Sequence, residues 1–149
     1  MHATWQQTSV DYCLRRRSYR LRICEFRETV CRQSNAIRVM PIATCPVPDP
    51  KEFAKSGRFG AHNIHENVPL PTAWQSETIV LGTFFNGGLR AYDISNAYQP
   101  REAGVFIPPA PARAPTGTIQ LNDVFVDERR IVYTVDRHIG GLYILEMNF

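Results

Sequence analysis

Residues 78–85 form a compact run of β-branched and aromatic side chains, which predicts a β-strand. The next residues, 86–88, read Asn-Gly-Gly and suit the positive φ angles of a tight hairpin turn. Residues 89–94 then alternate between apolar and polar side chains, and residues 102–107 form another short apolar run that ends at two prolines. The pattern therefore predicts a hairpin followed by a third strand.

The end of the chain repeats this plan. Three further strands are predicted, over residues 122–127, 131–136 and 142–147. Ile79 corresponds to Ile131 at an offset of 52 residues, and Gly87 corresponds to Gly140 at an offset of 53, so one residue is inserted at the turn. Self-similarity at such a spacing indicates a repeat, with one small sheet in each copy.

A repeat of roughly 40–50 residues with four strands is typical of a β-propeller blade. Residues 42–46 are predicted to be the outer strand of one blade, residues 62–107 a complete blade with its inner strand at 62–67, and residues 122–147 three strands of a last blade. The predicted fold class is all-β: a partial β-propeller of about two four-stranded antiparallel blades within residues 41–149. Two blades cannot close a ring, so we expect a fragment of a longer propeller.

The chain resembles the LVIVD-repeat β-propeller family over about residues 38–149. The resemblance rests on residues 85–95, 99–100, 122–128 and 136–146. It implies a closed ring of blades, usually built from a much longer chain. A last blade that ends after its third strand is similar to propellers that close with an N-terminal strand.

Residues 1–40 differ in composition and are predicted to lie outside the propeller. They hold eight arginines against three acidic side chains, a net charge of +5, while the rest of the chain has a net charge of −2. This segment is expected to be irregular or helical. A helix over about 12–32 and a single strand around 19–24 remain alternatives, because Arg, Glu and Leu favour helix whereas residues 19–24 alternate.

Cysteine usage favours a reducing compartment. The four cysteines contain no C-x-x-C pair, which gives little support to a zinc site, and no secretory signal precedes them. They are interpreted as free thiols, and a cytoplasmic location is favoured for the chain as written.

The strongest candidate for chemistry is the segment 60–67. His62 and His65 are three residues apart and Glu66 is adjacent to them, and imidazole and carboxylate groups are good ligands for zinc, copper or iron. On a strand these two histidines face opposite sides, so both can bind one metal only if the chain turns between them. His138 is a possible third ligand, although a turn residue is its simpler interpretation.

A second interpretation of the same segment is a ligand-binding channel mouth. In the repeat register Asn122 and Asp123 take the places of His62 and Asn63, so these four residues and Glu66 are expected at the start of two inner strands. The competing interpretation is structural: polar residues begin inner strands because their side chains line a wet channel and cap neighbouring strands. We favour the structural interpretation, since a metal site needs three or more converging ligands.

Composition narrows the function classes. The chain has 149 residues, 44% hydrophobic, with a formal net charge of +3, and no apolar stretch is long enough to cross a membrane. So small a charge argues against a nucleic-acid partner. The preferred hypothesis is a non-catalytic scaffold for ligands or proteins, with no cofactor. The alternative is a metal-dependent enzyme fragment with a divalent metal at His62 and His65, so whether the chain is an enzyme stays open.

An incomplete propeller is expected to associate. Unpaired blade edges and uncovered apolar faces, with residues such as Val80, Phe84, Val124 and Val132, would favour a protein partner or self-association.

Overall fold

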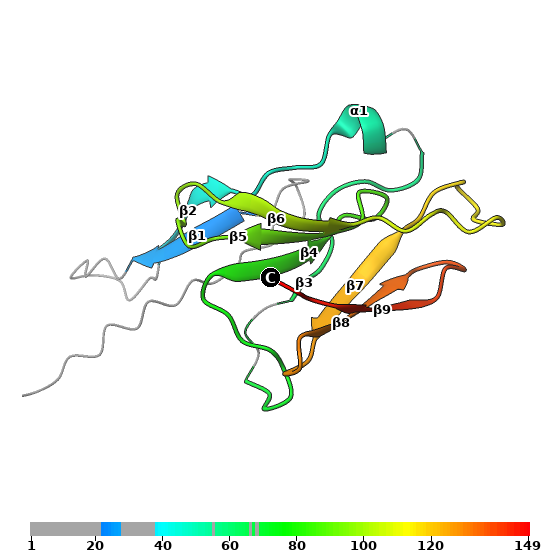
Figure 1. Ribbon diagram of the computed structural model, residues 1–149. Helices are drawn as coiled ribbons and strands as arrows, with labels where there is room; N and C mark the ends of the chain where they lie inside the picture. Colours follow the sequence, from blue (N-terminus) through cyan, green and yellow to red (C-terminus); the bar gives the residue numbers. More distant parts are fainter. Residues whose placement is uncertain (1–21, 28–37, 55, 66, 68) are drawn as a thin grey trace, which may run out of the picture.

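The computed structural model describes residues 22–27, 38–54, 56–65, 67 and 69–149, which form an all-β fold with one short helix. The elements are β1 (Arg22–Arg27), β2 (Arg38–Thr44), α1 (Pro50–Phe53), β3 (Ile64–His65), β4 (Ile79–Thr83), β5 (Leu89–Asp93), β6 (Arg101–Phe106), β7 (Leu121–Val126), β8 (Ile131–Asp136) and β9 (Leu142–Glu146). Figure 1 shows β3–β6 and β7–β9 as two separate layers inclined to each other. Within the described ranges, no helix has the length and apolar character to cross a membrane.

The first sheet consists of β3, β4, β5 and β6 in chain order, all antiparallel. The hairpin between β4 and β5 pairs Thr83 with Leu89, as the Asn-Gly-Gly turn predicts. Gly88 has a φ of +81°, and a Cβ atom there would lie 2.5 Å from the carbonyl oxygen of Phe106. Only glycine fits this position, because it tolerates both the angle and the close approach.

The second sheet consists of β7, β8 and β9, also in chain order and antiparallel. Asp127 closes the β7–β8 turn, since its Oδ1 accepts hydrogen bonds from the backbone N–H groups of Arg129 and Ile131, both at 3.0 Å. Asp136 closes the β8–β9 turn, where Gly141 has a φ of +78°. The three strands predicted for this segment are therefore confirmed.

The two sheets bury one shared apolar core between them. Its members include Leu81, Leu89, Ala91, Val126, Val132 and Leu145. The inner strands β3 and β7 meet at one side of this interface, and Phe85 at the end of β4 pairs with Leu121 at the start of β7. Covering these side chains supplies the main favourable free energy for holding the sheets together.

The opposite face of the first sheet is also covered. Val80, Phe84 and Tyr92 pack there with Cys45 and Ile42. Burial raises the pKa of the Cys45 thiol to about 11. The expectation that Val80 and Phe84 are exposed is therefore wrong, because the segment that carries Ile42 and Cys45 covers the face on which both lie.

The same correction applies to the second sheet, where Val132 is only 3% exposed and Val124 is partly buried against the core. The uncovered apolar face is the other side. Leu142 and Ile144 are 56% and 61% exposed, whereas Leu89 and Ala91, the residues that correspond to them in the first repeat, are each 5% exposed.

The N-terminal segment contributes a strand. β1 pairs with β2 in an antiparallel hairpin, so of the two alternatives the helix over 12–32 is wrong for residues 22–27, and a strand, the alternative predicted around 19–24, is found there. Pairing with β2 outweighs the helix propensity of the local residues. β2 begins at Arg38 and so crosses the boundary predicted near Met40. Residues 1–21 and 28–37, the rest of the segment predicted to be irregular or helical, lie outside the described residues.

Candidate functional site

A polar seam joins the starts of the two inner strands. The hydroxyl of Thr83 accepts a hydrogen bond from the backbone N–H of Asn63 at 3.1 Å and donates one to the carbonyl oxygen of Asn122 at 2.7 Å. The carboxylate of Asp123 accepts from the side-chain amides of Asn63 and Asn122. The structure thus brings His62, Asn63, Asn122 and Asp123 together, while Glu66 lies outside the described residues.

His62 lies at the end of this seam. Its Nδ1 is 2.9 Å from the carbonyl oxygen of Asn122, and because a carbonyl can only accept, Nδ1 carries the proton. In the part of the chain that the structure describes, Nε2 of His62 has no hydrogen-bond partner. The imidazole ring packs against Phe85, with 4.6 Å between the ring centroids.

His65 makes different contacts and is not brought together with His62. Its Nε2 donates to the carbonyl oxygen of Trp74 at 2.9 Å, and its Nδ1 accepts from the backbone N–H of Val126 at 3.2 Å. Its ring packs beside Trp74 and Phe125. Both ring nitrogens therefore bind backbone groups, and a metal could reach neither without breaking a hydrogen bond.

His138 is exposed in the β8–β9 turn. Among the described residues, no three His, Cys, Asp or Glu side chains are grouped so that they could hold a metal ion. The geometry of His65 and the position of His138 give no support to a shared metal centre with His62.

A cationic cluster that the sequence did not reveal lies beside His62. Arg58 and Arg137 both lie over the ring of Phe85, with their guanidinium carbons 6.0 Å and 5.7 Å from its centroid. Phe85 itself has a φ of 52°, a left-handed conformation that costs a non-glycine residue about 1–2 kcal/mol. We call Arg58, His62, Phe85 and Arg137 the Phe85 cluster.

Gln120 fixes the backbone of this cluster. It is 1% exposed, and its side-chain amide accepts from the N–H of Arg58 at 2.9 Å and donates to the carbonyl oxygen of the same residue at 3.4 Å. Its own carbonyl oxygen accepts from the N–H of Arg137 at 3.0 Å. One buried residue therefore positions the backbones of two arginines from different parts of the chain, that of Arg58 through its side chain and that of Arg137 through its main-chain carbonyl.

Two buried acceptors near the cluster have no hydrogen-bond partner within the described ranges. They are Oδ1 of Asn86, which follows Phe85, and Oδ1 of Asn122, whose backbone binds His62. Buried polar atoms are normally satisfied by protein or water, so each of these oxygens is an available acceptor. No sequence motif signals them.

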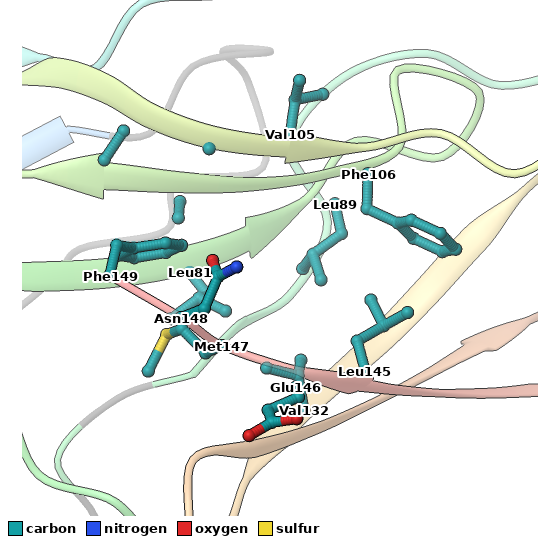
Figure 2. Close-up of a pocket in the computed structure, with 13 residues that line it drawn as sticks. Leu81, Leu89, Val105, Phe106, Val132, Leu145, Glu146, Met147, Asn148 and Phe149 are labelled. Atoms are coloured by element: carbon teal, nitrogen blue, oxygen red, sulfur yellow. The ribbon is translucent and has the colours of Figure 1, made fainter.

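An apolar cleft separates the outer strands of the two sheets. It encloses about 360 Å³ and is lined from both sheets by side chains such as Leu81, Leu89, Val132 and Leu145. Figure 2 shows these side chains together with Phe149 at the end of the chain. The cleft lacks a converging set of polar groups that would orient a ligand, so its geometry is that of a wedge where the sheets diverge.

Comparison of the chain with protein-family models, with curated proteins and with solved structures finds no match. The structure therefore defines the protein as an all-β chain of two antiparallel sheets with a polar seam and a cationic cluster where their inner strands begin.

Proposed function

We propose that the chain forms consecutive blades of a β-propeller of the LVIVD-repeat type and acts as a non-catalytic binding scaffold for ligands or proteins. The observation that carries this proposal is the way the two repeats stack. The first sheet packs against the second with the face that carries Leu89 and Ala91. The second sheet packs against the first with the face that carries Val132 and Leu145, which is the opposite face in terms of repeat positions. Stacking of this kind is directional and can continue with another unit.

The open side of the second sheet supports the proposal. Leu142 and Ile144 occupy the repeat positions that, in the first sheet, are buried by the following sheet. On the adjacent strand they pair with Val135 and Tyr133, so apolar side chains continue across this face. We propose that a further blade, supplied by an associating copy of the chain, covers this face.

The experiment measures the mass of the purified chain in solution by light scattering over a range of concentrations. The wild-type chain should associate, and replacing Leu142 and Ile144 together by glutamate should yield the monomer. Burial of one such side chain contributes about 1.5–3 kcal/mol, so each substitution should weaken association at least tenfold. The matched control is Tyr98→Glu, since Tyr98 is 68% exposed but lies in the β5–β6 loop.

A wild-type chain that stays monomeric at every concentration would contradict the scaffold arrangement. So would association that the double variant and the Tyr98→Glu control weaken equally, because the contact would then not involve this face.

A further inference from the structure

The Phe85 cluster gathers three nitrogen-bearing side chains around one aromatic ring. Arg58 precedes β3, His62 begins the inner edge of the same sheet, and Arg137 follows β8 of the other sheet. Since both guanidinium carbons lie within 6.0 Å of the same ring centroid, they are no further apart than twice that distance. The cluster thus spans the junction between the two repeats.

The positive charge in this cluster is not neutralised by the described residues. Neither Arg58 nor Arg137 forms an ion pair there, and both are exposed. The neighbouring carboxylate of Asp136 is buried and accepts from the backbone N–H groups of Gln120, Ile139 and Gly140. Asp136 therefore serves the turn rather than the arginines.

The backbones of the two arginines are held in place before any ligand binds, and each guanidinium group lies over the ring of Phe85. The side chain of Gln120 fixes the backbone of Arg58, and the backbone of Gln120 fixes that of Arg137. Gly57 allows this approach, because it has a φ of +70° and a Cβ atom there would lie 2.5 Å from Nε2 of Gln120. Because the backbone is already ordered, ligand binding costs only the conformational entropy of the two arginine side chains.

We propose that Arg58, Arg137 and His62 form a binding site for an oxyanion, a carboxylate or phosphate group carried by the ligand of the scaffold. The planar guanidinium group donates paired hydrogen bonds that match the oxygens of both anions. Nδ1 of His62 already donates to the carbonyl oxygen of Asn122, so Nε2 donates to the anion only when both ring nitrogens carry a proton, and the two guanidinium groups supply the main donors. This inference rests on the proposed scaffold function and names the class of ligand that it takes.

The test titrates the full wild-type chain with inorganic phosphate and, separately, with succinate at constant ionic strength, and follows binding by calorimetry and by the shift in melting temperature. Saturable binding of either anion is expected, and the tighter of the two identifies which oxyanion the site prefers. Arg58→Ala and Arg137→Ala should each weaken binding by roughly five- to tenfold, because both arginines are exposed and one charge-assisted contact is lost.

Arg101→Ala is the matched control. It removes the same charge from an exposed arginine, but Arg101 pairs with Asp93 at the end of the first sheet opposite the β4–β5 turn. The affinity of the Arg101→Ala variant for the anion should equal that of the wild-type chain. Melting temperatures measured in chloride alone distinguish anion binding from a purely structural role, in which the arginines stabilise the fold around Phe85 without binding an anion.

The proposal is overturned if neither anion binds saturably, or if all three arginine substitutions weaken binding equally. It is also overturned if the Arg58 and Arg137 variants lower the melting temperature equally in chloride and in phosphate. The light-scattering result is independent of these outcomes, since the oligomeric state depends on Leu142 and Ile144 rather than on the cluster.

Discussion

His65 connects the two sheets through its imidazole ring, and replacing it by phenylalanine should destabilise the fold. The residue is 6% exposed at the end of β3. Its Nδ1 accepts from the N–H of Val126 on β7, and its Nε2 donates to the carbonyl oxygen of Trp74. Phenylalanine preserves the ring and its packing against Trp74 and Phe125 but removes both hydrogen bonds.

The magnitude follows from the two groups that lose their partners. A buried polar group left unsatisfied costs about 1–3 kcal/mol. The N–H of Val126 is fully enclosed, since Val126 is 0% exposed, and should contribute near the upper end. Trp74 is half-buried, so water can partly replace its lost donor. We expect the free energy of unfolding to fall by about 3 kcal/mol, which is a large fraction of the stability of a small domain.

Urea unfolding followed by circular dichroism measures this loss, provided that the slope with denaturant stays unchanged. His138→Phe is the matched control, because His138 is exposed in a turn and its substitution should change stability by less than about 0.5 kcal/mol. A loss below about 1 kcal/mol for His65→Phe would refute the reasoning. So would a wild-type chain that a metal chelator destabilises as much as the substitution does.

Two further predictions concern a turn and the core. Gly57→Ala should lower the melting temperature and weaken phosphate binding, because the new methyl group would meet Nε2 of Gln120 at 2.5 Å while the backbone keeps a φ of +70°; differential scanning fluorimetry with and without phosphate measures both effects. Stability should fall as pH rises above 9, because burial raises the pKa of Cys45 from 9.0 to about 11 and also raises that of Tyr92. As pH rises, the unfolded chain releases these protons before the folded chain does. The free energy of unfolding therefore falls by up to about 1.4 kcal/mol per pH unit for each group. Urea unfolding at pH 8 and pH 10 checks this, and equal stability at both would contradict it.

The strands and their turns were predictable because their signals are local. Ile79 to Thr83 are β-branched or apolar apart from one glycine, and the following Asn-Gly-Gly supplies the conformations that a hairpin needs. The spacing between the repeats also predicted which strands belong to the first sheet and which to the second. Which apolar face stays uncovered was not predictable, since Val80 and Ile144 look alike in sequence and differ only in what packs against them.

The N-terminal strand shows the limit of local propensity. Residues 22–27 contain arginine and glutamate, which favour helix, yet they pair with β2. A hairpin partner contributes backbone hydrogen bonds that no propensity scale includes. Where two patterns are nearly balanced, as they are here, the neighbouring strand decides.

His62 and His65 were considered as a metal-binding pair because they are neighbours in sequence, although the structural interpretation was preferred. The structure separates them: His62 binds Asn122 beside Phe85, whereas His65 binds Val126 and Trp74. His62, just before β3, and His65, at the end of β3, therefore contact different parts of β7. Spacing could identify the segment, but it could not identify which long-range partners occupy each ring nitrogen.

The Phe85 cluster escaped detection for a reason that lies in the repeat itself. Comparing repeats draws attention to the positions that agree, such as Ile79 with Ile131. Phe85 and Arg137 occupy the same place in the two copies at the offset of 52 residues, and they differ. Stacking brings these unlike residues together, so that the aromatic ring of one copy carries the guanidinium group of the next. In this chain, the mismatched positions at the sheet junction are therefore the ones to test for binding.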